Sequence, residues 1–326
     1  MLPPLRRCFP DATITMLLRQ YTGALVRGNS SVDEILWYDD GEDLLPFYTM
    51  TRSLRQRRFD AAIVVYPTLR LALLMFCAGI RVRIGTGYRY YSFLFNRRVY
   101  EHRRDAKRHE LEYNLRLLEE LGCHPEGRPT FPVNIPGDAE HAVDILMKEE
   151  TISGTIVILH PGSGGSARDW HVENFAMLAQ RLSDDSALTV LVTGTAGESR
   201  LADTIVAATD GRARSLAGKL TVPQLGALCK RADVFVSNST GPMHIAAALG
   251  TPVVGLFPRH PAMSKERWGP YTERSIVLVP DMPAACDTCV AHGSVRCTCM
   301  DAITVDAVAE AISALRSRYP HNKPVA

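Results

Sequence analysis

The sequence predicts an α/β protein with two Rossmann-like domains, each built around one parallel sheet. The chain has 326 residues, of which 46% are hydrophobic and 22% are charged, which is enough to bury two cores. In the C-terminal half, continuous apolar runs alternate with amphipathic helical stretches, a pattern typical of a parallel sheet covered on both faces. The N-terminal half repeats the alternation less regularly.

The apolar runs and their spacing place the individual elements. In the C-terminal half we expect strands at residues 155–159, 188–193, 234–237 and 252–257, separated by helices at 173–182, 198–208, 223–231 and 243–249. In the N-terminal half we expect strands at 13–17, 35–38, 61–66 and 82–85, and a helix at 109–121. Loops at the carboxyl ends of such parallel strands are where ligands bind.

Loop signals divide the chain into an N-terminal domain (residues 1–135), a linker (136–154) and a C-terminal domain (155–326). Pro136 and Gly137 open the linker, which contains one helix at 139–149. A doubly wound domain usually opens with a central strand, whereas residues 4–8 of this chain predict a helix. We therefore expect the first strand of the N-terminal domain to lie upstream of Met1.

Charge and hydropathy exclude several classes of protein. The formal net charge is only +2, so composition gives no reason to expect a nucleic-acid partner. The longest apolar run, residues 71–80, is too short to span a bilayer, and the first residues lack the apolar core of a signal peptide. We expect a cytoplasmic protein with mostly reduced thiols, in which Cys8, Cys77, Cys123 and Cys229 are isolated and packed.

The loop after the expected strand at 155–159 is rich in glycine and ends in Arg168-Asp-Trp170. Glycines let the backbone approach a ligand closely, and the amides at the start of the following helix favour a diphosphate. Ser163 adds a hydroxyl, and Arg168 adds a permanent charge whose geometry suits phosphate oxygens. The alternative is that these residues only allow the tight turn between the strand and the helix and bind no ligand.

A second loop, Asn238-Ser239-Thr240-Gly241-Pro242-Met243-His244, precedes the helix at 243–249. Proline in the first helical turn after hydroxyl residues is a well-formed helix start. His244 lies in that first turn, where the helix dipole disfavours its charged form, so it either binds phosphate or sugar or packs in the core. Glu198, at another helix start, either binds ribose hydroxyls or serves only as a favoured N-terminal residue.

Two further groups of residues are candidates for binding a ligand. Four cysteines, Cys286, Cys289, Cys297 and Cys299, could hold a structural zinc or iron ion, although the second pair is more closely spaced than in common zinc sites. The alternative is a loop of reduced structural thiols. Residues 81–108 mix many arginines with tyrosine and phenylalanine, which suits an anionic or membrane-borne acceptor or an ordinary solvated face.

The two long loops together resemble those of a known family. The matching stretches are His160-Pro-Gly with Ala167-Arg168-x-Trp170-x3-Asn174-Phe175-Ala176, and Asn238-Ser-Thr-Gly-x2-His244-x-Ala-Ala-Ala-Leu-Gly250-x-Pro252. They are similar to the corresponding motifs of glycosyltransferase family 9, the ADP-heptose:lipopolysaccharide heptosyltransferases. The resemblance covers nearly the whole chain.

This resemblance implies a GT-B fold, in which an acceptor-binding N-terminal domain and a donor-binding C-terminal domain face a central cleft. It implies inverting transfer of heptose from ADP-heptose to the lipopolysaccharide inner core, with no metal or other cofactor needed for catalysis. An acceptor in the inner membrane implies peripheral contact with its cytoplasmic face. The donor site implied by the resemblance consists of Ser163, Arg168, Glu198, Ser239, Thr240, Gly241 and His244.

The chain departs from the family at three points. Arg168 stands where the family usually has lysine, and Ser239 stands where it often has aspartate, which suggests a donor other than the standard heptose. The family's Gly-Asp loop, which carries the expected catalytic base, would lie upstream of Met1. The alternatives to a heptosyltransferase are a non-catalytic sugar-nucleotide or glycan-binding relative, and a transferase with another donor or a protein acceptor.

Overall fold

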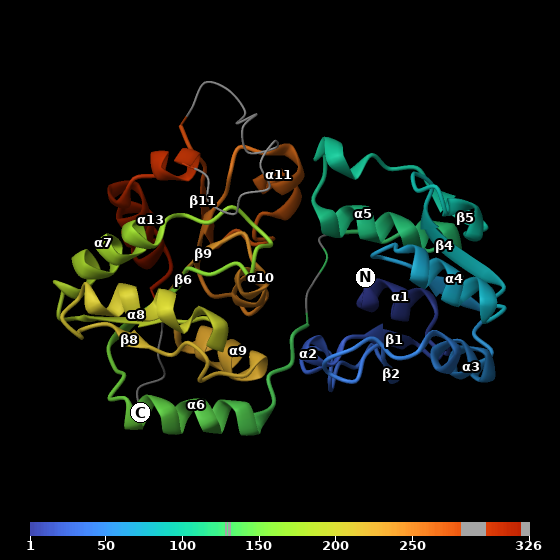
Figure 1. Ribbon diagram of the computed structural model, residues 1–326, viewed down its shortest axis with the longest axis horizontal. Coiled ribbons are helices and arrows are strands. Elements are labelled where there is room, and N and C mark those ends of the chain that lie inside the picture. Colours follow the sequence, from blue (N-terminus) through green and yellow to red (C-terminus); the bar gives the residue numbers. More distant parts are fainter. Residues whose placement is uncertain (128, 130–131, 282–297, 321–326) are drawn as a thin grey trace. The chain divides into compact units, whose positions relative to one another are not determined.

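The computed structural model describes residues 1–127, 129, 132–281 and 298–320, and it divides the chain into two compact units. The N-terminal unit spans Met1–Asn134 and the C-terminal unit Ile135–Ala326. All strands that pair within the sheets of both units are parallel. Figure 1 shows helices packed around the sheets of each unit. The α/β class expected from the sequence is thus confirmed.

The C-terminal unit is built on a six-stranded sheet with the strand order β11-β10-β9-β6-β7-β8. Its strands are β6 (Thr155–His160), β7 (Leu188–Val192), β8 (Arg214–Ser215), β9 (Val234–Asn238), β10 (Val253–Leu256) and β11 (Ser275–Leu278). The first strand along the chain, β6, lies inside the sheet, and the chain adds strands on one side and then on the other. The order therefore reverses between β6 and β9, and a ligand crevice is expected at such a point.

Alternate residues of the central strands supply two separate cores, one on each face of this sheet. Val157 and Leu159 face helices α7 (Val172–Ser183), α8 (Ser199–Ala207) and α13 (Val305–Arg318). Ile156 and Ile158 face helices α6 (Gly137–Glu149), α9 (Val222–Arg231) and α10 (Gly241–Ala248). The continuous apolar runs seen in the sequence therefore reflect burial on both faces.

Helix α6 belongs to the C-terminal unit, although the sequence placed it in a linker. It packs against α9, and its Val143 is buried in the core on that face of the sheet. Ion pairs from Lys230 to Glu140 and from Arg231 to Asp144 join the two helices at the surface.

The N-terminal unit has shorter strands, which form two sheets where the sequence predicted one. Strands β1 (Thr15–Leu18) and β2 (Glu34–Trp37) form one pair, and β3 (Ala61–Ile63), β4 (Val82–Thr86) and β5 (Arg97–Val99) form the other sheet. One core serves both sheets, because Leu36 of β2 and Val64 after β3 pack in the same cluster with helices α3 (Phe47–Arg57) and α4 (Leu69–Cys77). Within the described residues, β1 and β3 each pair with a single strand.

A disulfide corrects one expectation about the cysteines. Cys8 ends helix α1 (Leu2–Cys8) and is bonded to Cys123, which follows helix α5 (Glu110–Arg116) and the 3-10 helix η3 (Leu117–Leu121). Their Cα atoms are 5.8 Å apart, within the usual range for a disulfide. The expectation that these two thiols are isolated was wrong, because a separation of 115 residues conceals their proximity. Cys229 is buried as expected.

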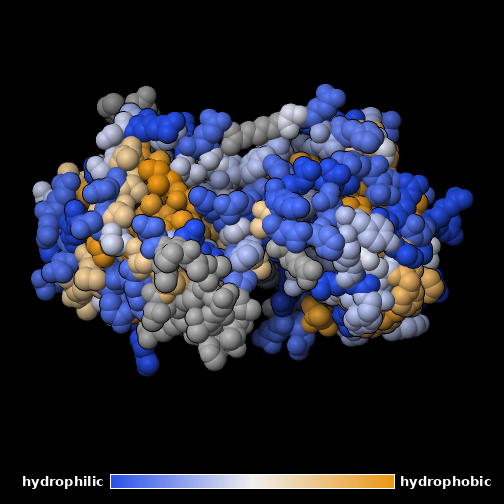
Figure 2. Space-filling view, turned by 90° about the horizontal axis from the view of Figure 1, so that it is seen from above, coloured by the Kyte–Doolittle hydropathy of each residue, from blue (hydrophilic) through white to orange (hydrophobic). Residues whose placement is uncertain are grey.

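Among the described residues, no helix is both long and apolar enough to cross a bilayer. The face shown in Figure 2 is mainly hydrophilic, with hydrophobic residues in small groups.

Candidate functional site

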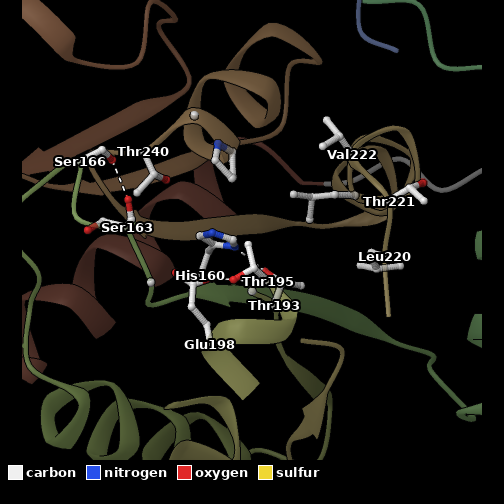
Figure 3. A pocket seen from close by; sticks show the side chains of 16 residues that line it. His160, Ser163, Ser166, Thr193, Thr195, Glu198, Leu220, Thr221, Val222 and Thr240 are labelled. Carbon is white, nitrogen blue, oxygen red and sulfur yellow. Dashed lines mark hydrogen bonds between the residues drawn. The ribbon is translucent and has the colours of Figure 1, made fainter. Parts of the chain in front are cut away.

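A pocket of about 250 Å³ opens at the carboxyl edge of the six-stranded sheet, where the strand order reverses. Its walls come from the ends of β6 and β7, from the loop after β9 and from the starts of α9 and α10 (Figure 3). The lining residues are His160, Gly162, Ser163, Gly164, Ser166, Thr193, Gly194, Thr195, Glu198, Leu220, Thr221, Val222, Leu225, Thr240, Gly241 and Pro242. Hydroxyl groups and backbone amides therefore dominate its polar lining.

His160, the last residue of β6, forms the floor of this pocket and is only 6% exposed. Its Nδ1 lies 2.9 Å from the Thr193 hydroxyl oxygen, and its ring stacks on Phe235. Burial lowers the pKa of His160 to about 4, although the negative charge of Glu198 acts in the opposite direction. The imidazole is therefore neutral at pH 7 and offers a hydrogen-bonding group without a positive charge.

Glu198 lines one side of the pocket and takes part in a capping box. Its Oε2 accepts hydrogen bonds from the backbone N–H of Thr195 (2.7 Å) and from the Thr195 hydroxyl (2.9 Å) at the start of the 3-10 helix η4 (Ala196–Glu198). The same carboxylate packs directly against Gly162, where an added Cβ would collide with it. Glu198 therefore serves the helix start and, in the position that it occupies, leaves no room for a side chain at residue 162.

Asn238, at the end of β9, ties the two loops of the site together. Its side chain is fully buried. Its Oδ1 accepts a hydrogen bond from the backbone N–H of Trp170 (2.9 Å), and its Nδ2 donates one to the carbonyl oxygen of Pro161 (2.7 Å). These two bonds hold both ends of loop 161–170 against the strand on the other side of the reversal point.

The charged residues of loop 161–170 are largely buried. Arg168 is only 8% exposed, so its cation is held in place by the fold. Burial raises the pKa of Asp169 to about 6, and the nearby Glu198 acts in the same direction, while Ser163 and Arg168 oppose the shift. Asp169 Oδ1 is buried without a hydrogen-bond partner in the part of the chain that the structure describes. The loop therefore combines a fixed cation with a carboxyl group that titrates near neutrality.

The loop after β9 leads into α10, whose first-turn amides carry the positive end of the helix dipole. The hydroxyl oxygens of Thr240 and Ser237 lie 3.0 Å apart, and Thr240 is only 5% exposed. Gly241 and Pro242 begin the helix and line the pocket. This arrangement is suited to a phosphate group, which accepts hydrogen bonds from amides and hydroxyls.

The structure brings Ser163, Glu198, Thr240 and Gly241 together in the pocket wall. Three other candidates lie beside it without lining it: Arg168 in the loop after β6, Ser239 in the turn after β9, and His244 in the first turn of α10. Sequence reasoning did not single out His160, Thr193, Thr195 or Thr221. Two of these carried a signal, because Thr195 with Glu198 and Thr221 with Gln224 match the spacing of capping boxes.

The possible zinc or iron site at the four cysteines lies mostly outside the described residues. Cys286, Cys289 and Cys297 lie outside the described residues, and Cys299 is buried in the core beside α7 and α13. No group of three or more histidine, cysteine, aspartate or glutamate side chains within the described ranges could hold a metal ion.

Comparisons with known proteins place this chain in a family. The family model of glycosyltransferase family 9 (heptosyltransferase) matches residues 47–293. Lipopolysaccharide heptosyltransferase 3 of Escherichia coli K12 is 25% identical over 283 residues, which cover 83% of this chain and 80% of the relative.

Two solved structures share the fold. The structure of the Escherichia coli ADP-heptose lipopolysaccharide heptosyltransferase II has a TM-score of 0.78 and 23% identity, covering 97% of this chain and 93% of the other. An Escherichia coli heptosyltransferase with ADP has a TM-score of 0.69 and 16% identity, covering 96% and 94%. The molecule is thus a glycosyltransferase with the two-unit α/β architecture of the GT-B class. The chain belongs to glycosyltransferase family 9.

Proposed function

We propose that this chain transfers heptose from ADP-heptose to the inner core of lipopolysaccharide, with inversion at the sugar carbon and without a metal ion. The observation that supports the donor most directly is the pocket at the strand reversal, where two helix starts and a glycine-rich loop converge. The names of the relatives support the sugar and the acceptor, since they are lipopolysaccharide heptosyltransferases, and one related structure contains ADP.

Each donor residue has a role in this proposal. The diphosphate lies between loop 161–170 and the start of α10, where Ser163, Thr240 and Gly241 offer hydroxyls and amides. Arg168 supplies the positive charge beside it, Glu198 faces the ribose, and Ser239 and His244 contact the sugar or a phosphate. Fixed dipoles and a buried cation stabilise the charge that develops on the departing ADP.

The acceptor hydroxyl must lose a proton during the transfer, and this requires a base. The family resemblance assigns this base to a Gly-Asp loop, and that assignment remains a prediction. His160 does not fill this role in the proposal, because it is buried at the floor of the donor pocket and hydrogen-bonds Thr193. A lipid-borne acceptor further suggests that the protein works in the cytoplasm, at the face of the inner membrane.

A ligand screen by thermal unfolding tests the donor. A ligand present at about a hundred times its dissociation constant stabilises the native state by about 2.7 kcal/mol, which is readily measured. We expect ADP and ADP-heptose to raise the unfolding temperature, and Arg168→Ala to abolish the effect. Stabilisation by UDP or GDP in place of ADP would contradict the proposed donor. Donor binding without transfer to lipopolysaccharide core would favour the non-catalytic alternative or another acceptor.

A further inference from the structure

Four exposed tyrosines follow the three strands of the β3-β4-β5 sheet in the N-terminal unit. Tyr66 follows β3, Tyr88 and Tyr90 follow β4, and Tyr100 follows β5, with exposed fractions of 80%, 45%, 80% and 61%. The carboxyl ends of neighbouring parallel strands meet at one edge of a sheet, so these rings share that edge. We call this set of four residues the tyrosine edge.

The rings of Tyr88 and Tyr100 are held in fixed positions despite their exposure. Tyr88 stacks on His102 with ring centroids 4.0 Å apart, and it meets Tyr100 edge to face at 5.5 Å. The ring of Tyr100 lies directly against the backbone of Gly87, where an added Cβ would collide with it. Both rings therefore have defined contacts, and each keeps an exposed part.

The loop that carries Tyr88 and Tyr90 is itself rigid. The hydroxyl of Ser92 donates a hydrogen bond to the carbonyl oxygen of Thr86 (2.6 Å) and accepts one from the backbone N–H of Arg89 (3.0 Å). Tyr91 is buried, donates its hydroxyl to the carbonyl oxygen of Pro67 (2.7 Å), and meets Tyr90 edge to face. Binding a ligand here would cost little loss of conformational entropy.

The composition of this edge favours a carbohydrate over a membrane or an apolar protein surface. The exposed rings here are mainly tyrosines, with Phe93 (69% exposed) in the same loop. Tyrosine hydroxyls hydrogen-bond with sugar hydroxyls, while the negative ring face attracts polarised C–H groups of a sugar ring. Arg89, between Tyr88 and Tyr90 in the sequence, is exposed and forms no ion pair within the described ranges. An exposed guanidinium on the same loop as these rings suits a sugar that carries a phosphate or a carboxylate.

We propose that the tyrosine edge binds the acceptor as an anionic oligosaccharide, with one sugar ring stacked against Tyr88 and Tyr100 and its charged group paired with Arg89. This inference rests on the proposed function for its acceptor class, and it assigns the acceptor's binding surface to named residues of the N-terminal unit.

Binding of lipid-free, deacylated lipopolysaccharide core oligosaccharide, measured by titration calorimetry without donor, tests the proposal. We expect Tyr88→Ala and Tyr100→Ala each to weaken binding about tenfold, as loss of a stacking ring does in other sites. Tyr88→Phe keeps the ring and should bind within about twofold of the unaltered chain. Equal binding by Tyr88→Ala, Tyr100→Ala and the unaltered chain would overturn the proposal.

Phe76→Ala is the matched control. Phe76 is 52% exposed in the last turn of α4, which begins after β3 and ends before β4 and therefore ends at the opposite edge of the sheet. Its loss should leave oligosaccharide binding unchanged. A loss of affinity as large as that of Tyr88→Ala would show that the effect is not specific to the tyrosine edge.

Separate experiments test the contact made by Arg89 and the alternative that the tyrosine edge binds a membrane. Arg89→Ala should weaken binding of the untreated oligosaccharide, and comparison with a phosphatase-treated sample shows whether a phosphate or a carboxylate is the partner. No change with either sample would remove Arg89 from the proposal. Ring-dependent binding to vesicles of phosphatidylglycerol and phosphatidylcholine, without binding to the oligosaccharide, would overturn the carbohydrate assignment.

The test of oligosaccharide binding does not depend on whether the proposed donor is correct. The calorimetric titration contains no nucleotide sugar, so failure of ADP-heptose to bind would refute the proposed donor and leave the tyrosine edge standing. Conversely, the Tyr88→Ala variant should retain full stabilisation by ADP, because its change lies in the other unit.

Discussion

The two units use the carboxyl edges of their parallel sheets in opposite ways. In the C-terminal unit, the edge of the six-stranded sheet forms a pocket whose polar groups are buried and tied by hydrogen bonds, such as those of Asn238. In the N-terminal unit, the edge of a three-stranded sheet presents exposed rings. A sheet covered on both faces can support buried polar groups, because their partners are fixed by two cores.

This contrast predicts that substitutions at the edge of the six-stranded sheet affect folding and binding together. Substitutions at the tyrosine edge should affect binding alone. The largest effect is expected for Asn238→Ala. The change leaves the Trp170 N–H and the Pro161 carbonyl group without their partner, so the C-terminal unit should lose about 4 kcal/mol, at roughly 1–3 kcal/mol for each buried group. Hydrogen exchange of the β6 and β9 amides measures this.

Asn174→Ala is the matched control for that variant. Asn174 donates its side-chain N–H to Asp301 at the surface (2.9 Å), and its loss should change stability by less than about 0.5 kcal/mol. Similar exchange rates in the Asn238 and Asn174 variants would mean that the buried bridge does not organise the pocket.

The next effect is a pH dependence from His160. Its folded pKa of about 4 lies below its ordinary value of 6.5, so the unfolded chain takes up a proton first as the pH falls. The stability contribution is fully present above about pH 6.5, and about 3 kcal/mol is lost as the pH approaches 4. The C-terminal unit should therefore unfold more readily across this window, and His160→Gln should flatten the dependence.

The pH dependence of stability that Asp169 contributes has the opposite sign to that of His160, so the two contributions must be measured separately. Its raised pKa means that stability falls as the pH rises from about 3.8 to about 6. The His160 contribution is therefore measured as the difference between the unaltered chain and His160→Gln at each pH. Parallel pH profiles for the two proteins would contradict the buried, neutral imidazole.

A smaller loss is expected for Gly162→Ala, whose new methyl group collides with the Glu198 carboxylate. The carboxylate can move aside only by giving up its capping-box contacts with Thr195, which costs about 0.5–2 kcal/mol. The affinity for ADP should fall with the stability, and in a Glu198→Ala background, where the carboxylate is absent, Gly162→Ala should cost less stability than in the unaltered chain. Gly197→Ala, whose Cβ would approach only the Thr195 hydroxyl at 3.9 Å, is the control and should be close to neutral. An equal cost of Gly162→Ala in both backgrounds would refute the contact.

The smallest effect on stability is expected at the tyrosine edge. Because Tyr88 and Tyr100 are 45% and 61% exposed, either change to alanine should alter the free energy of unfolding by less than about 1 kcal/mol, including their edge-to-face contact. Thermal unfolding of the variants checks this. A large destabilisation would mean that the rings serve the fold, and the contrast between the two edges would fail.

The sequence was most informative where burial was greatest. The strands β6, β7, β9 and β10 could be predicted because both faces of each are apolar. Strand β5 was missed because Arg97-Arg98-Val99 has no apolar pattern and both arginines are exposed. The split of the N-terminal strands into two sheets was also missed, because pairing depends on neighbours that hydropathy does not reveal.

In the candidate site, too, the sequence predicted only features that depend on local motifs. Glycine-rich and helix-start motifs identified Ser163, Glu198, Thr240 and Gly241, since those motifs are local in sequence. The bridging role of Asn238 depends on partners 68 and 77 residues away, and the burial of His160 depends on the packing of Phe235. Such roles are set by tertiary contacts and have no local signature.

The central claim is that the pocket at the end of β6 binds the nucleotide part of the donor. Hydrogen exchange with and without saturating ADP tests it most directly, since it reports on each segment of the chain. We predict slower exchange in the segments 160–166, 193–198 and 238–244, and no change around the tyrosine edge. Protection confined to other segments, or protection by UDP or GDP but not by ADP, would contradict the claim.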